Sequence, residues 1–364
     1  MPRSDMPVWS VLVAGVAGFG ALGGVAACGG DRDRPGDAGF DAPALDAAQP
    51  DAGPPPCSYT ERSDATNDPT AEPTGLTVGS SPQTLCGKIN TGHFSDATTT
   101  VDSDGYRVTS DGGNLIVRFF GSPGPAALVE LSVFVFNTDV NPTLLSGGSN
   151  NPIVRDHGAF LIALPAGTYD IVVNVRNPAD LAAAFDYKVQ LAPDGPGRCA
   201  AVTAPAAYTE VADGTGAGND VIAVSFGVDP PFQLTASTAD AAEPTGLTID
   251  GRAPVRITGS SADENAADDY MDRDTYLVRT AAATTELTLR LGWAAATTDL
   301  QYIVFPADQT QPIGDSFRRV GNDKVNVIAV NPGSAYWIWI GSHDDSTGLP
   351  AAYDLTICGA DLAP

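Results

Sequence analysis

The sequence is poor in basic residues. Its 364 residues include 19 Lys and Arg against 44 Asp and Glu, a formal net charge of −25. Lysine occurs only as Lys88, Lys188 and Lys324. So acidic a chain offers no basic face for phosphates and no polybasic patch for anionic lipids. Nucleic acid is therefore excluded as a partner.

Histidine is also scarce, and the familiar catalytic motifs are missing. His93, His157 and His343 lie far apart in the chain, and there is no HExxH, GxSxG or glycine-rich phosphate loop. The sequence therefore predicts a protein that is not an enzyme. A lipoprotein hydrolase with a site assembled from distant residues stays a remote alternative.

A long uncharged run covers residues 8–27 and ends in Val25-Ala26-Ala27-Cys28. Five glycines weaken it as a permanent membrane helix. Small residues before a cysteine resemble a bacterial lipobox, and the resemblance implies a signal peptide over 1–27 and acylation of Cys28. Gly29 follows in place of Asp, so the family's inner-membrane retention signal is missing and the outer membrane is expected. An ordinary signal peptide or a single anchor helix are the alternatives.

The segment that follows has almost nothing to pack. Residues 29–56 are rich in Asp, Ala, Gly and Pro, so they cannot offset chain entropy by burial and are expected to be disordered. A flexible chain of this length spans about 30 Å. We interpret 28–56 as a tether to the bilayer, similar to the Asp-Ala tethers of myxobacterial-type lipoproteins.

The remainder is an internal repeat. The segment AEPTGLT at 71–77 recurs letter for letter at 242–248, and the Asp-x-Asp-x-Tyr of 102–106 recurs at 272–276. Order is kept and the spacing drifts slowly, which indicates a duplicated domain. We assign copy 1 to 57–198 and copy 2 to 199–364, with a linker near Pro193–Pro205 and an inserted hairpin near 220–241.

Apolar residues in both copies alternate with period two, as in the segment ELTLRLGW of 286–293. Further segments rich in Val, Ile and Phe are separated by Gly, Pro, Asn and Asp; they are 130–136, 159–164, 169–175 and 324–330. No helical stripe is sustained. The sequence predicts an all-β protein with two tandem, jelly-roll-like β-sandwiches of about seven antiparallel strands each.

The recurring residues resemble the bacterial pre-peptidase C-terminal (PPC) domain family. The family shows Asp-x-Asp-x-aromatic, then a small-Gly-x-Tyr strand start and a final strand with Tyr. The matching residues are Asp102, Asp104, Tyr106, Gly167, Tyr169 and Tyr187 in copy 1, and Asp272, Asp274, Tyr276, Gly333, Tyr336 and Tyr353 in copy 2. The resemblance implies a β-sandwich appended to secreted enzymes and credited with polymer or surface binding. Here no peptidase domain precedes the copies.

Four cysteines remain besides Cys28, and an even number in an exported chain indicates disulfides. Pairing within copies, Cys57–Cys86 and Cys199–Cys358, respects the domain boundary. The alternative, Cys57–Cys199, would leave Cys86 to reach Cys358 across it.

The repeated aspartates allow two interpretations. Asp102, Asp104, Asp272 and Asp274, with the acidic residues of 263–274, are hard oxygen ligands suited to Ca²⁺. In the alternative, the aspartates bind backbone N–H groups of their own loops.

Two tryptophans are the aromatic candidates. Alignment with copy 1 turns Tyr336 inward and Trp337 and Trp339 outward, where they form a flat platform for a sugar, with His343 nearby. The inserted hairpin is a competing cover for both rings. We therefore expect a non-catalytic envelope lipoprotein that binds polysaccharide or an envelope protein; the alternative is a purely structural spacer.

Overall fold

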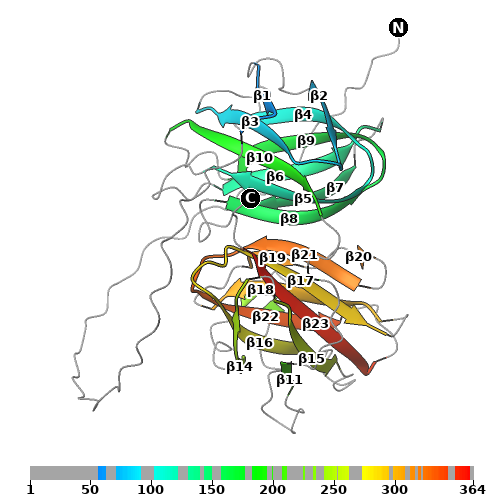
Figure 1. Cartoon of the computed structure of the whole chain (residues 1–364), viewed down its shortest axis with the longest axis vertical. Coiled ribbons are helices and arrows are strands. Elements are labelled where there is room, and N and C mark those ends of the chain that lie inside the picture. Colours follow the sequence, from blue (N-terminus) through cyan, green and yellow to red (C-terminus); the bar gives the residue numbers. More distant parts are fainter. Residues whose placement is uncertain are drawn as a thin grey trace, which may run out of the picture.

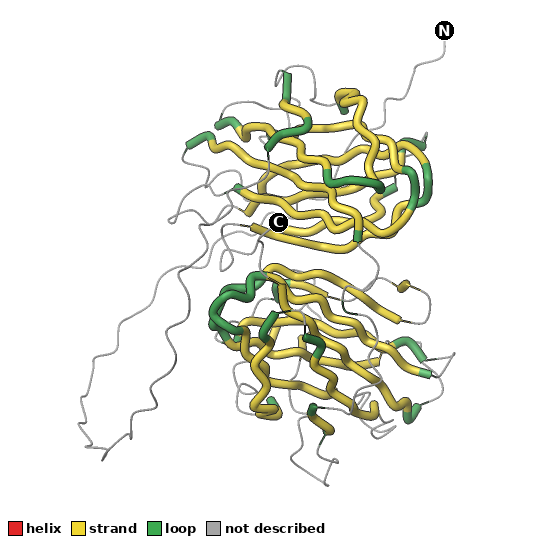
Figure 2. The backbone as a smooth tube through the Cα atoms, viewed as in Figure 1, coloured by secondary structure: helices red, strands yellow, loops and turns green. Residues whose placement is uncertain are grey.

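The computed structural model describes 56–62, 71–91, 102–121, 130–139, 143–149, 157–176, 183–194, 199, 207–210, 224–225, 233–234, 242–251, 253–261, 273–294, 298–307, 312–315, 319–320, 323–342 and 349–360. The signal peptide, Cys28, the tether up to residue 55, Asp272, His93 and His343 lie outside these residues. Every regular element in the described part is a strand (Figure 2). None of the described residues belongs to a helix long and apolar enough to cross a membrane.

Copy 1 is a sandwich of two five-stranded sheets (Figure 1). The first sheet has the order β1-β3-β10-β5-β8, and the second β2-β4-β9-β6-β7. The strands are β1 Tyr59–Thr60, β2 Glu72–Val78, β3 Gln83–Ile89, β4 Ser103–Ser110, β5 Gly113–Phe120, β6 Glu130–Asn137, β7 Leu144–Ser149, β8 His157–Leu164, β9 Gly167–Arg176 and β10 Phe185–Pro193.

Copy 2 repeats this plan with sheets β11-β15-β23-β17-β21-β20 and β14-β16-β22-β18-β19. Its strands are β11 Tyr208–Thr209, β14 Glu243–Ile249, β15 Val255–Ser261, β16 Arg273–Thr280, β17 Glu286–Trp293, β18 Leu300–Pro306, β19 Gly314–Asp315, β20 Arg319–Val320, β21 Asp323–Ala329, β22 Ala335–Ser342 and β23 Ala351–Ala360. The antiparallel pair β12 (Val224–Ser225) and β13 (Gln233–Leu234) lies in the segment where the sequence predicts an added hairpin.

Two β-sandwich domains are thus confirmed, with two differences from the expectation. Each domain has more than seven strands, because short or polar segments such as β1 and β2 also pair. The sheets are mixed, since β1 runs parallel to β3, and β2 runs parallel to β4. The equivalent strands of copy 2, β11 with β15 and β14 with β16, are parallel too.

The alternation of apolar residues places one face of every long strand in a core. In β9, Tyr169, Ile171 and Val173 are buried in the core of domain 1. Tyr336, Ile338 and Ile340 of β22 are buried in the core of domain 2, as the alignment of the copies predicts. Each domain therefore closes its own core between its two sheets.

The repeated AEPTGLT segment forms the bulged edge strands β2 and β14. The Thr74 hydroxyl donates to the Arg107 carbonyl at 2.8 Å and accepts from the Leu76 N–H at 3.0 Å. Between them, Gly75 has a φ of +72°, a conformation that favours glycine. Thr245 makes the same pair of hydrogen bonds in copy 2. The repeated segment therefore fixes the same backbone conformation in the edge strands of both copies.

Candidate functional site

A buried relay of one aspartate and two tyrosines links the two sheets of domain 1. The Tyr187 hydroxyl on β10 donates to Asp104 Oδ2 on β4 at 2.6 Å. The Tyr187 hydroxyl has one proton, and it points to Asp104. In the second hydrogen bond, the Tyr106 hydroxyl therefore donates to the Tyr187 oxygen, 2.5 Å away. Burial raises the pKa of both tyrosines, and the Asp104 carboxylate raises it further. The phenols therefore stay protonated as donors.

The relay fits only because β3 has a glycine beside it. A Cβ at Gly87 would lie 2.3 Å from the Tyr187 hydroxyl and 2.4 Å from that of Tyr106. A third ring, Tyr59 of β1, packs edge-on against Tyr106 with centroids 6.2 Å apart. The sequence motifs did not point to Gly87 or Tyr59 as site residues, although the segment Tyr-Thr-Glu at 59–61 recurs at 208–210.

Domain 2 contains the same relay. Tyr353 donates to Asp274, and its hydroxyl lies 2.6 Å from that of Tyr276. A Cβ at Gly259 would lie 2.3 Å from the Tyr353 hydroxyl, and Tyr208 packs edge-on against Tyr276. Part of the pattern that resembles the PPC family is thus a core hydrogen-bond network in both copies, formed by Asp104, Tyr106 and Tyr187 and by Asp274, Tyr276 and Tyr353.

This geometry bears on the calcium interpretation. Asp104 and Asp274 are buried and accept tyrosine protons, while Asp102 accepts the backbone N–H of Asn90. Asp102 thus agrees with the backbone interpretation, whereas tyrosine partners were not expected. The described residues contain no group of three or more potential metal ligands. Calcium at Asp102, Asp104, Asp272 and Asp274 stays a prediction, and Asp272 with the acidic segment before it lies outside the described part.

The two tryptophans lie on the outer face of β22, as expected, but they are buried. Trp337 is 8% exposed and Trp339 2%. They pack with Ile303 and Phe305 of β18 in a cluster separate from the core of domain 2, and Ala242, just before β14, lies against it. A flat exposed platform at Trp337 and Trp339 is therefore not present in this structure.

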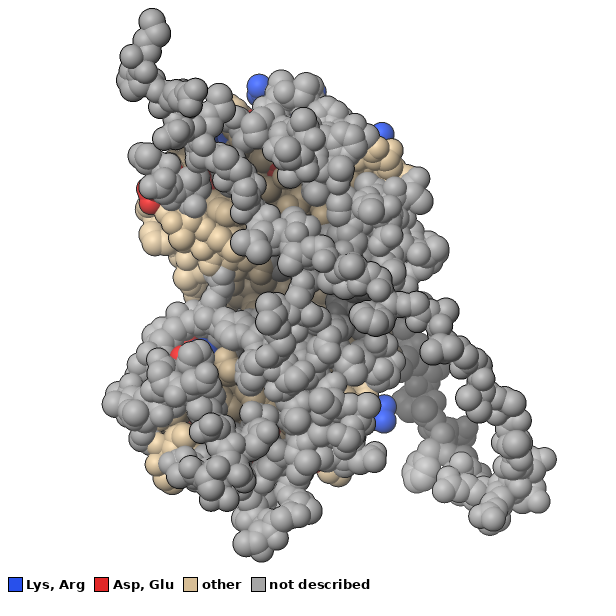
Figure 3. Space-filling model, turned by 180° about the vertical axis from the view of Figure 1, so that it is seen from behind, with Lys and Arg blue, Asp and Glu red and all other residues tan. Residues whose placement is uncertain are grey.

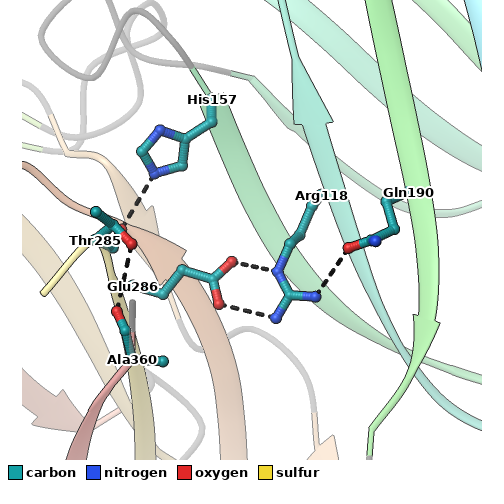
Figure 4. A network of polar contacts seen from close by, with 6 residues as sticks. All are labelled: Arg118, His157, Gln190, Thr285, Glu286 and Ala360. Carbon is teal, nitrogen blue, oxygen red and sulfur yellow. Dashed lines mark hydrogen bonds and ion pairs between the residues drawn. The ribbon is translucent and has the colours of Figure 1, made fainter. Parts of the chain in front are cut away.

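The two domains meet along β8 and β21. Beside this contact, a buried polar network joins Arg118 and His157 of domain 1 to Glu286 and Thr285 of domain 2 (Figure 4). Arg118 Nε of β5 donates to Glu286 Oε1 of β17 at 2.5 Å, and Nη2 donates to Oε2 at 2.9 Å. Its Nη1 donates to Gln190 Oε1 of β10 at 3.2 Å. The Glu286 side chain is 1% exposed and that of Arg118 12%, so solvent screens this bidentate pair little.

Further contacts extend the interface on both sides of the ion pair. The Leu161 N–H donates to Asn326 Oδ1 at 2.9 Å, and His157 Nε2 lies 3.2 Å from the Thr285 carbonyl. Ile116 and Leu161 form an apolar cluster with Val327 of the other domain. His157, which no sequence motif assigns to a site, is thus an interface residue.

A groove of about 520 Å³ lies on the outer face of the β15-β23-β17-β21 sheet. Two ion pairs line it: Arg256 with Asp354, and Arg290 with Asp323. A second groove of about 600 Å³ on the matching face of domain 1 includes Lys88, Lys188 and Glu61. Described charges appear as separate spots, not one patch, on the face in Figure 3. Both grooves therefore contain positively and negatively charged side chains that can form hydrogen bonds.

The disulfides join Cys57 to Cys86 and Cys199 to Cys358. The first ties the segment before β1 to β3, and the second ties the start of copy 2 to β23. Both bonds stay within one copy, as the sequence favours. Disulfides are typical of proteins outside the reducing cytosol.

No family model and no curated protein matches this chain. Similar solved structures include the pre-peptidase C-terminal domain of collagenase from Bacillus anthracis, with 14% identity over 32% of this chain and 95% of that one, TM-score 0.25. PliG of Aeromonas hydrophila, a periplasmic inhibitor of g-type lysozyme, has 15% identity over 33% and 99%, TM-score 0.21. Tandem CBM51 modules of a Streptococcus pneumoniae glycoside hydrolase have 10% identity over 70% and 81%, TM-score 0.19. Values this low transfer no function.

Proposed function

We propose that this chain is a non-catalytic lipoprotein of the cell envelope, anchored in the outer membrane through Cys28, whose two sandwiches form a rigid spacer. The lipobox-like Val25-Ala26-Ala27-Cys28 supports the anchor. The two disulfides support an oxidising compartment.

The interface between the domains carries the spacer role. Domains joined only by a linker move independently by default. Here a buried bidentate ion pair, Arg118 with Glu286, and the apolar contact of Leu161 with Val327 hold them together. The burial of Trp337 and Trp339 also favours the spacer over a sugar platform.

The rigid arrangement is tested by small-angle X-ray scattering of residues 57–364. Arg118→Ala leaves the Glu286 carboxylate buried without its guanidinium, so we expect a larger radius of gyration and maximum dimension. The matched control is Arg256→Ala, which removes an ion pair within domain 2 and should leave scattering unchanged. Wild-type scattering that does not fit the arrangement of the two domains would refute the rigid spacer, and unchanged scattering of the Arg118→Ala protein would show that the ion pair does not hold the domains together.

The anchor is tested by mass spectrometry of the mature N-terminus and by fractionation. We expect a lipid-modified N-terminal Cys28, and a Cys28→Ser protein that no longer fractionates with membranes. Cleavage at another position contradicts the anchor without affecting the spacer argument.

Binding or adhesion to a polysaccharide or an envelope protein is the second candidate, favoured by the groove around Arg256 and Arg290. Paired charges on a sheet face can hydrogen-bond to sugar hydroxyls or to a partner's backbone. A pull-down with glycans and cell-wall material tests it on residues 57–364. Arg256→Ala should weaken capture if the groove binds; absence of any capture favours the spacer alone.

A further inference from the structure

The interface between the domains is built from equivalent strands of the two copies. Strands β5 and β8 follow β10 in the sheet of domain 1, as β17 and β21 follow β23 in that of domain 2. The registers fix the equivalent residues. Arg118 pairs with Gln190 and Ala159, and Arg290 pairs with Thr356 and Val325.

Since Tyr187 of β10 corresponds to Tyr353 of β23, Gln190 corresponds to Thr356. It follows that Arg118 corresponds to Arg290, and Ala159 to Val325. Two residues after Ala159 and Val325, Leu161 corresponds to Val327. Two residues before Arg118 and Arg290, Ile116 corresponds to Thr288, and two residues further back Asn114 corresponds to Glu286.

The apolar contact joins equivalent positions. Ala159 and Leu161 of β8 meet Val325 and Val327 of β21, with Ile116 beside them. Opposite Val327 on β17 is Thr288, the counterpart of Ile116. The same small patch of each domain therefore faces its own equivalent.

The polar contacts run in opposite directions about this centre. Arg118 lies two residues after Ile116, and its partner Glu286 lies two residues before Thr288. His157 is opposite Phe120, four residues after Ile116, and it reaches Thr285, three residues before Thr288. Contacts that advance along one domain recede along the other, as a two-fold axis between Ile116 and Thr288 requires.

We propose that the interface is isologous, with the two domains related by a pseudo-two-fold axis. The partner that this face recognises is a second copy of the same domain, which the duplication supplies within one chain. A two-fold interface presents the same patch on both sides, so each contact has a symmetry mate. This inference goes beyond the spacer role, because it identifies what the face binds.

The symmetry mate of the Arg118–Glu286 pair is Arg290 with position 114. Asn114 is uncharged, and Arg290 bonds to Asp323 of its own domain instead. Asn114 lies on the same outward face of β5 as Ile116 and Arg118, since the alternate residues Leu115 and Val117 are in the core. The chain thus keeps one of the two ion pairs that the symmetry allows.

The test places a carboxylate at the symmetry-related position of the full chain. Asn114→Glu should pair with Arg290, whose guanidinium has enough donors to serve Asp323 as well. We expect the midpoint of the unfolding transition of the full chain to be higher for N114E than for the matched control N114Q, because the new carboxylate stabilises the interface between the domains. With Arg290→Gln added to both proteins, the difference should vanish.

The carboxylate can also be moved. E286N should lower the midpoint, and N114E/E286N should recover part of the loss where N114Q/E286N does not. If N114E is no more stable than N114Q in either background, or if its advantage survives R290Q, the two-fold relation is refuted. The single N114E series keeps the test valid even if E286N does not fold.

Discussion

Replacing Tyr187 by Phe separates the two ends of the buried relay in domain 1. The substitution keeps the ring and removes the hydroxyl that donates to Asp104 and accepts from Tyr106. Asp104 is fully buried, so water does not replace the lost donor. Each buried polar group left unsatisfied costs about 1–3 kcal/mol, so the loss of a partner at both Asp104 and Tyr106 should lower the unfolding free energy of Y187F by about 2–6 kcal/mol.

The matched control is Tyr106→Phe, at the donor end of the same relay. It removes one hydrogen bond and leaves Tyr187 donating to Asp104, so it should cost only about 0.5–1.5 kcal/mol. Urea denaturation of residues 57–364, followed by circular dichroism, measures both. The pair Tyr353→Phe and Tyr276→Phe repeats the comparison in domain 2.

The order of the two costs is the critical result. If Y106F destabilises the protein as much as Y187F does, the proton order in the relay is wrong. If neither substitution changes the unfolding free energy by more than about 0.5 kcal/mol, the relay contributes nothing beyond ordinary packing.

The four relay tyrosines have pKa values raised above their ordinary 10.0, so their contribution to stability should be complete below pH 10 and lost as pH rises further. In a pH titration, phenolate absorbance of these tyrosines should appear together with unfolding. Ionisation of these tyrosines before unfolding would contradict their burial. The disulfides close 159 and 29 residues, so in the loop-entropy model replacing both cysteines of the longer one by Ser should cost about 1.5 kcal/mol more, checked by urea unfolding. Because Trp339 is buried, Trp339→Ala should cost about 3–5 kcal/mol of stability in thermal denaturation; a fully stable variant would show that the ring is exposed.

Several features of the fold could be predicted from the sequence because they depend on local patterns. Alternation of apolar residues determines which face of a strand is buried, so Tyr336 inward and Trp337 outward followed directly from the alignment of the copies. The even number of cysteines around a clear boundary favoured the two bonds that the structure contains. The duplication itself is visible in the repeated AEPTGLT.

The sequence could not predict what lies against an outward face or beside a buried polar group. The hydrogen bond of Asp104 could not be predicted, because its donor, Tyr187, lies on a strand of the other sheet. The exposure of Trp337 depends on which residues pack over β22. The pairing of Arg118 with Glu286 depends on how the two domains meet. Alternation acts between neighbours in the chain and is written in the sequence, whereas these contacts join residues far apart and exist only once the sheets and domains have packed.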